Sequence, residues 1–118
     1  MIDVSVILDK AGGISRLSLE GHAGGAPGGE NLACAAVSLL VRSVARLLAS
    51  KPGWLVEGNA PKPGSFYLSV QRHSLAEQRH FDDMTQWLKG ITDTLLQALA
   101  DVGEEYPSTL SVEIERKE

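Results

Sequence analysis

The chain has 118 residues, of which 43% are hydrophobic and 22% are charged, and its formal net charge is −4 at pH 7. This composition is that of an ordinary globular protein, and we expect residues 1–118 to form one domain. The acidic balance argues against a basic face that grips phosphates, so no direct nucleic-acid partner is expected. The longest apolar run, Leu32 to Val41, covers only ten residues before Arg42, which argues against a membrane span.

The single cysteine, Cys34, limits the kinds of disulfide and metal site that the chain can form. One cysteine excludes an intramolecular disulfide and a zinc site built from cysteines, and we expect no metal and no cofactor. Near the N-terminus, Asp3 stands where a secretory signal carries basic residues, and no small-residue cleavage site follows. We therefore expect a cytoplasmic protein.

The first residues predict a β-hairpin. Residues 2–8 alternate apolar and polar side chains, which is typical of a half-buried strand. Residues 9–13, "DKAGG", are turn formers, and residues 14–21 predict the returning strand with Leu17 and Leu19 facing inward.

Residues 31–50 predict the first helix. Asn31 is a good N-cap, the residues after it are rich in Ala and Leu, and Pro52 ends the helical pattern. Apolar residues nearly surround this helix, so we expect it to be covered on most sides.

The second half of the chain predicts two strands over 54–57 and 66–71, a helix over 75–102 and a last strand over 108–115. In the helix, apolar residues step by three and four: Phe81, Met84, Leu88, Ile91, Leu95, Ala98 and Val102. This stripe is either the core face of an amphipathic helix or a surface shared with a second subunit. The order ββα-ββ-αβ predicts an α+β fold of two layers, a mainly antiparallel sheet with two helices packed on it.

Cys34 and His22 supply the parts of a nucleophilic site. Cys34 lies three residues after the expected N-cap, in the first helical turn, where free N–H groups and the helix dipole favour thiolate over thiol. His22, at the exit of the second strand, is placed to accept and return a proton. Backbone amides at the helix start, including that of Cys34, are candidate donors to a developing oxyanion.

Other interpretations stay open at this point. A lone cysteine in a small domain is commonly a buried, unreactive side chain. The stretch 24–29, "GGAPGG", is suited to close over an extended ligand, whereas a phosphate-binding loop would carry a lysine after its glycines, and none follows here. His73 and His80 border the second helix, and we expect both on the surface.

Residues 21–38 resemble the signature of a known protease family. "GHA" (21–23), a short glycine-containing loop and "CAAVS" (34–38) at the head of a helix are similar to the motif of the ribosomal-processing cysteine protease family, Prp. The element order and the chain length fit that family too, so the resemblance covers essentially the whole chain. It implies a small cytoplasmic endopeptidase, often a homodimer, that removes a short N-terminal extension from a large-subunit ribosomal protein.

The resemblance also implies residue roles. Cys34 corresponds to the nucleophile and His22 to the general acid and base. The expected substrate-binding loop contains Gly21, Ala23, Gly24, Gly25, Gly28 and Gly29. Ser38 matches the motif serine, and its hydroxyl is expected to bond either near the active site or to the backbone carbonyl four residues earlier.

Asn31 departs from the family pattern, which usually has Asp at this position. Asparagine keeps the capping function and accepts a hydrogen bond from an imidazole N–H, but it brings no charge to stabilise an imidazolium. The departure leaves a second hypothesis: a catalytically weak or inactive peptide-binding module, associated with ribosome assembly, that holds a peptide in the same groove.

Overall fold

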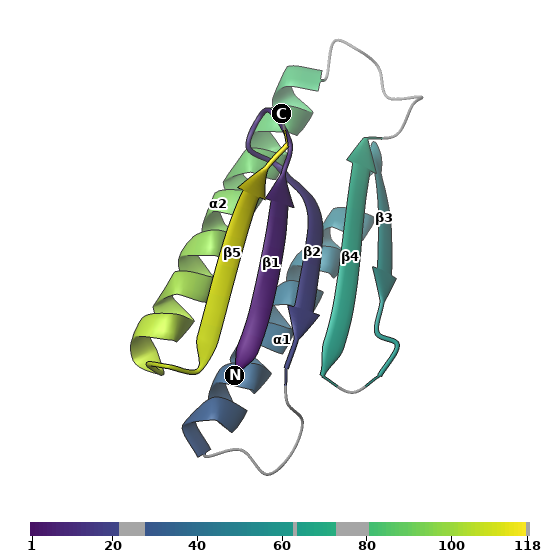
Figure 1. The fold of residues 1–118 in the computed structure, drawn as a ribbon. Helices are drawn as coiled ribbons and strands as arrows, with labels where there is room; N and C mark the ends of the chain where they lie inside the picture. The colour runs from purple at the N-terminus through teal and green to yellow at the C-terminus, as the bar shows by residue number, and fades with distance from the viewer. Residues whose placement is uncertain (22–27, 63, 73–80, 118) are drawn as a thin grey trace.

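The computed structural model describes residues 1–21, 28–62, 64–72 and 81–117. Its elements follow the expected order ββα-ββ-αβ (Figure 1). They are β1 (Ile2–Leu8), β2 (Ile14–Glu20), α1 (Gly28–Ala49), β3 (Trp54–Asn59), β4 (Ser65–Arg72), α2 (Phe81–Glu105) and β5 (Leu110–Arg116).

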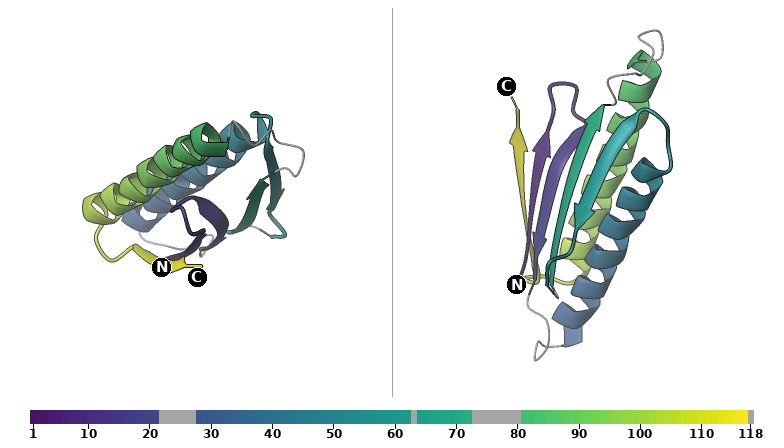
Figure 2. Two further views of the ribbon diagram at one scale, coloured as in Figure 1. Left: turned by 90° about the horizontal axis from the view of Figure 1, so that it is seen from above. Right: turned by 90° about the vertical axis from the view of Figure 1, so that its right-hand side faces the viewer.

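The five strands form one sheet in the order β3-β4-β2-β1-β5, and both helices pack on the same face of it (Figure 2). Three of the strand pairs are antiparallel, and β1 pairs with β5 in parallel. A parallel pair needs a crossover rather than a tight turn, and α2 carries the chain back before β5 starts. The expected α+β fold with a mainly antiparallel sheet is confirmed.

The turn between β1 and β2 is built around Asp9. One carboxylate oxygen of Asp9 accepts hydrogen bonds from the backbone N–H groups of Ala11 and Gly13, each at 2.9 Å. Gly12 has φ of 89°, a left-handed conformation that glycine adopts at little cost. The residues "DKAGG" therefore form the turn that the sequence predicts.

The core lies between the sheet and the helices. Alternate residues of β1 point into it, and each is at most 3% exposed: Ile2, Val4, Val6 and Leu8. From α1, Ala33, Val37, Val41 and Leu48 are fully buried against the strands. These residues follow the periods of a strand and a helix, which is why the alternation in residues 2–8 located the inner face of the sheet.

The buried face of α2 is displaced from the expected stripe. Leu88 and Leu95 are buried as expected, but Thr92 and Leu99 have no exposed surface, whereas Ile91 and Val102 are only partly buried. A repeat of three and four residues averages 3.5, and a straight helix has 3.6 residues per turn, so the true stripe drifts away from such a pattern.

The outer side of α1 is not covered by any described residue. Leu32, Leu39 and Leu47 are 58%, 63% and 39% exposed, so the expectation that this helix is covered on most sides is wrong for the described part of the chain. The stretch Leu32–Ala49 is long and apolar enough to cross a membrane, and 22% of it is buried. The ten-residue run did not reveal this property, because apolar residues continue beyond Arg42 with Val44, Leu47 and Leu48. Core helices of soluble proteins also have such a length and composition.

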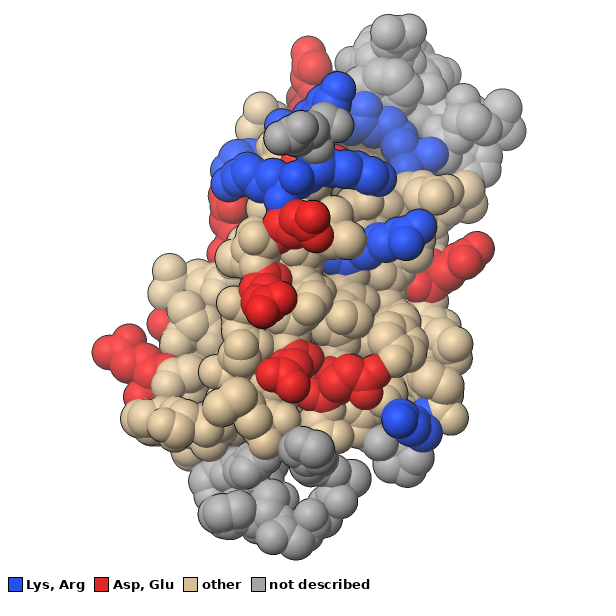
Figure 3. Space-filling model, viewed as in Figure 1, with Lys and Arg blue, Asp and Glu red and all other residues tan. Residues whose placement is uncertain are grey.

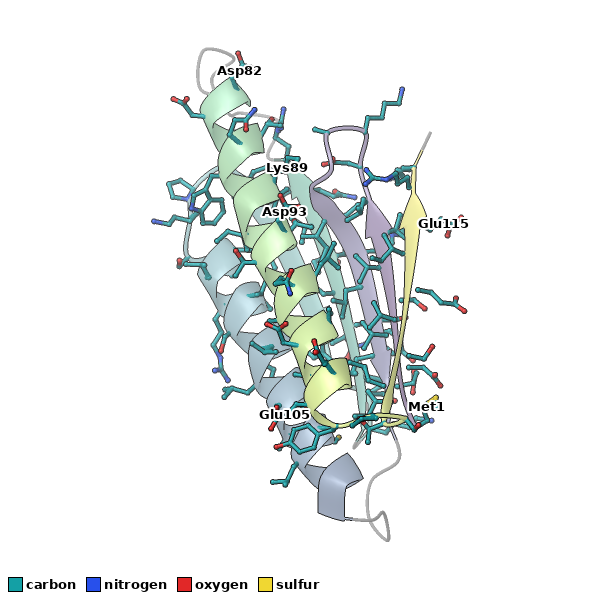
Figure 4. The ribbon with its side chains drawn as sticks, turned by 90° about the vertical axis from the view of Figure 1, so that its left-hand side faces the viewer. Met1, Asp82, Lys89, Asp93, Glu105 and Glu115 are labelled. Carbon is teal, nitrogen blue, oxygen red and sulfur yellow. The ribbon has the colours of Figure 1, made fainter. Side chains whose placement is uncertain are left out.

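The open face of the sheet is polar. Lys and Arg side chains gather at the end near the β1–β2 turn, and Asp and Glu side chains lie towards the middle and the opposite end (Figure 3). The outer surface of α2 carries an ion pair of helical spacing between Lys89 and Asp93, at 2.8 Å (Figure 4). Exposed pairs of this kind contribute little to stability.

Thr92 joins α2 to the sheet by a buried hydrogen bond, because its hydroxyl accepts from the backbone N–H of Ile14 at 2.9 Å. We expect Thr92→Val to lower the free energy of unfolding by about 1–3 kcal/mol, since the N–H of Ile14 then stays buried without a partner. Urea unfolding measures this difference.

The matched control is Thr94→Val, on the exposed side of the same helix, which we expect to change stability by less than about 0.5 kcal/mol. Equal stabilities of the two variants would mean that the bond to Ile14 does not hold α2 on the sheet.

Candidate active site

Cys34, the expected nucleophile, lies near the start of α1, at the end of the sheet where β2 ends (Figure 1). Gly21, the residue after β2, is fixed by its backbone N–H, which donates to the carbonyl oxygen of Gly64 at 2.7 Å. This bond continues the β2–β4 ladder, in which Glu20 pairs with Ser65, by one more step. The position from which the chain leaves the sheet is therefore set by strand pairing.

Cys34 lies directly beside Gly21. A Cβ atom built on Gly21 would be 3.7 Å from Cys34 Sγ, 3.7 Å from a side-chain carbon of Ile2 and 3.8 Å from the carbonyl oxygen of Gly64. These are ordinary contact distances, so a side chain at residue 21 would fit but would lie on the sulfur. Glycine at this position leaves that side of the sulfur uncovered.

Cys34 is a free, half-buried thiol. Its neighbours in the helix, Ala33 and Val37, are fully buried, and Cys34 itself packs against the core cluster. The side chain therefore lies at the border between the core and the surface, and the backbone that carries it is held by packing.

The start of α1 corrects the sequence prediction. The helix begins at Gly28, so Asn31 lies inside the first turn and is not the N-cap. Gly28 and Gly29, expected in the substrate-binding loop, belong to this helix as well. Glycine costs about 1 kcal/mol in a helix relative to alanine, which is why the pattern favoured a later start. Residue 27 is proline, which is common at the first positions of helices, and the sequence prediction did not take this signal into account.

This earlier start changes the surroundings of Cys34. Cys34 is the seventh residue of α1, in its second turn. Only the first four N–H groups of a helix lack a partner within it, so the N–H of Cys34 is already part of the helical ladder. Its expected role as an oxyanion donor is wrong for this conformation.

The remaining predicted residues divide into two groups. Ser38 is half-buried on α1, and no described residue forms a hydrogen bond with its hydroxyl, so the bond to the carbonyl four residues earlier is not formed. His22, Ala23, Gly24 and Gly25 lie outside the described residues, as do His73 and His80.

A hydrogen-bonded cluster that the sequence analysis missed lies next to Gly21. The carboxylate of Glu20 accepts a hydrogen bond from the Ser65 hydroxyl at 2.6 Å and another from the Tyr67 hydroxyl. The only sequence signal for it is alternation, which places Ser65 and Tyr67 on one face of β4, but nothing in the sequence shows that β4 pairs with β2.

This cluster favours the ionised form of Glu20. The hydrogen bonds from Ser65 and Tyr67, together with the positive charge of Lys62, lower the pKa of Glu20 below its ordinary value of 4.5. The same bond to Glu20 raises the pKa of Tyr67 above its ordinary value of 10.0. A charged carboxylate therefore lies at the exit of β2. Among the described residues, no group of three His, Cys, Asp or Glu side chains is placed to hold a metal ion.

Comparisons with known proteins agree with this architecture. A family model described as "Cysteine protease Prp" matches residues 1–111. A search of curated proteins gave no match.

Solved structures share the fold at low sequence identity. A crystal structure of the ribosomal processing protease Prp from Staphylococcus aureus, in complex with a substrate peptide, matches with a TM-score of 0.75 and 18% identity. The match covers 98% of this chain and 100% of that one. A Streptococcus mutans protein matches with a TM-score of 0.73 and 21% identity, over 99% of this chain and 96% of that one.

The Glu20 cluster predicts a pH-dependent stability. The folded state lowers the pKa of Glu20, so the unfolded state binds its proton first as the pH falls. We expect the stability difference between the wild type and Glu20→Gln to be complete above pH 4.5 and to shrink as the pH drops below it. Urea unfolding between neutral and acidic pH measures this difference.

The control is the same pair of proteins in a Ser65→Ala, Tyr67→Phe background, which removes both donors. There, we expect Glu20→Gln to change the pH profile of stability much less, because only the charge of Lys62 still lowers the pKa of Glu20. A profile that depends on Glu20 as strongly as it does in the wild type would show that the two hydroxyls are not the main cause.

Proposed function

The chain belongs to the family of the cysteine protease Prp, and on this premise we propose that it is an endopeptidase that processes a ribosomal protein. Its substrate is a large-subunit ribosomal protein, from which it removes a short N-terminal extension in the cytoplasm. Cys34 is the nucleophile and His22 the general acid and base.

The observation that carries this proposal is the contact between Gly21 and Cys34. The two residues are thirteen positions apart in the sequence, yet the sulfur lies 3.7 Å from where a side chain on Gly21 would begin. His22 follows Gly21 directly in the sequence, so the proximity of Cys34 to Gly21 supports the pairing of Cys34 with His22.

The mechanism is acyl transfer. The Cys34 thiolate attacks the scissile carbonyl carbon, and protonated His22 gives its proton to the amine nitrogen as the C–N bond breaks. Water, deprotonated by His22, then attacks the thioester, and the acid product leaves as the sulfur is restored. Neither step needs a metal or a cofactor.

We further propose that the protein acts as a homodimer in which α1 contributes to the interface. Leu32, Leu39 and Leu47 lie on one side of α1 and are exposed to solvent. Apolar side chains grouped on one side of a helix are stabilised when a second surface covers them.

The cleavage assay compares the wild type with Cys34→Ala and His22→Ala. The substrate is a synthetic peptide that spans the N-terminal extension and the start of the same organism's ribosomal protein, and mass spectrometry locates the cut. We expect a single cut, with kcat/KM lower by about 10³-fold or more in each variant, because each removes a group that takes part in the transition state.

His73→Ala and His80→Ala serve as matched controls and are expected to cleave like the wild type. A Cys34→Ala protein that cleaves at the wild-type rate would refute the proposed mechanism. Peptide that binds to the wild type but is never cut would favour the second hypothesis, the binding module, for which the Asn31 departure is the motivation.

The dimer is tested by Leu39→Glu, with light scattering on a size-exclusion column as the measurement. A stable interface buries about 800 Å² on each partner, and a charge placed at its centre disfavours association. We expect a dimer for the wild type and a monomer for Leu39→Glu. Leu55→Glu, which changes a leucine of β3 that is 48% exposed, is the control and should remain dimeric. A monomeric wild type would refute the proposal.

A further inference from the structure

A groove of about 430 Å³ runs between the second half of α1 and the β3 edge of the sheet. In both views of Figure 2, α1 lies beside β3. The floor of the groove is apolar and includes Ala45, Ala49, Val56 and Phe66. Gly58 also lines it, and a Cβ atom at that position would lie at contact distance, 3.5 Å, from the Phe66 ring.

Two arginines line this groove without a partner among the described residues. Arg42 and Arg46 are exposed, and neither forms an ion pair, a hydrogen bond or a ring contact with a described residue. They are four residues apart on α1, so their charges repel each other across one helical turn. The chain has a net charge of −4 and many acidic side chains, yet no described one forms an ion pair with either arginine. The folded chain therefore leaves two positive charges at an apolar groove.

The groove is aligned with the candidate nucleophile. Cys34, Ser38 and Arg42 follow one another at intervals of four residues, which places them along the same side of α1. Eight residues of helix separate the sulfur-bearing residue from the first arginine, a rise of about 12 Å. An extended peptide covers this distance in about three to five residues.

The strand beside the groove can also accept an extended chain. Among the described strands, β3 is the edge of the sheet and pairs with β4 alone, so the backbone N–H and C=O groups on its other side have no partner among these strands. Edge strands of this kind bind peptides by adding a strand, with side-chain pockets providing selectivity.

We propose that this groove binds an extended segment of the substrate that carries a carboxylate side chain about three to five residues from the scissile bond. Arg42 and Arg46 receive the carboxylate, and the apolar floor receives its neighbours. The proposal rests on the proposed function, since it takes Cys34 as the site of cleavage. It makes Arg42 and Arg46 determinants of specificity, separate from the catalytic pair.

The test uses peptides in which a single Glu is moved along an otherwise uncharged version of the ribosomal-protein sequence, with Gln at the same position as the reference. Their binding to full-length Cys34→Ala protein is measured by fluorescence anisotropy, and their cleavage by the wild type is measured in parallel. We expect a Glu at the matching distance to bind about fivefold more tightly than Gln, with a lower KM and an unchanged kcat.

The protein side of the test is Arg42→Gln with Arg46→Gln, which should remove the preference for Glu. Arg42→Lys with Arg46→Lys should retain part of it, and Arg116→Gln, at the opposite end of the sheet, should retain all of it. Removing two charges that repel each other should not lower the melting temperature. Should a variant nevertheless fail to fold, the comparison of Glu with Gln peptides on the unchanged protein still decides the matter.

The outcomes separate the two proposals. Peptides that are cut without any preference for Glu, or with a preference that survives the loss of both arginines, overturn the groove assignment and leave the protease intact. Peptides that bind through the arginines but are never cut support the groove and overturn the protease. Absence of both binding and cleavage overturns both. An arginine-dependent affinity for a labelled single-stranded RNA, with no preference for Glu peptides, overturns the carboxylate assignment in favour of phosphate.

Discussion

The pairing of β2 with β4 is the constraint on which the candidate site depends. This ladder ends in the hydrogen bond from Gly21 to Gly64, and the Glu20 cluster braces the same end with two side-chain bonds. Gly21 is thereby fixed against Cys34, although the residues between them include a glycine-rich stretch that strongly favours the unfolded state entropically. The strand pairing thus sets the position of Gly21 beside Cys34. The sequence between these two residues is not needed to hold them together.

Much of this architecture could be predicted from local patterns. Alternation in residues 2–8 located the inner face of β1, and "DKAGG" located the first turn, because both signals act within a few residues. The buried face of α2 was harder to predict. Thr92 is polar, so counting apolar residues missed it, although its side chain is fully buried and accepts a hydrogen bond from Ile14. The Glu20 cluster could not be predicted from the sequence. Its hydroxyl donors lie 45 and 47 positions after Glu20, and the strand pairing that brings them together leaves no local pattern.

The start of α1 shows where a propensity argument is weakest. Asn31 is a favourable cap, but a helix that begins at Gly28 forms three more residues of ladder. The cost of about 1 kcal/mol for each glycine in the helix opposes the gain from a longer helix. The balance is too small for helix propensity alone to predict where the helix starts. The consequence is chemical, because the shift of one turn moves the free amides of the helix away from Cys34.

Different sides of helix α1 have different roles in packing and in the candidate site. Ala33, Val37 and Val41 hold it on the sheet, while Leu32 and Leu39 point away from it. The side that carries Cys34 and Arg42 lies between these two, at the border of the core and away from the outer apolar surface. The spacing along this side is fixed by the helical rise of about 1.5 Å per residue. A groove on the same rigid element as the nucleophile therefore measures a constant distance along a bound peptide, which a groove formed by loops would not.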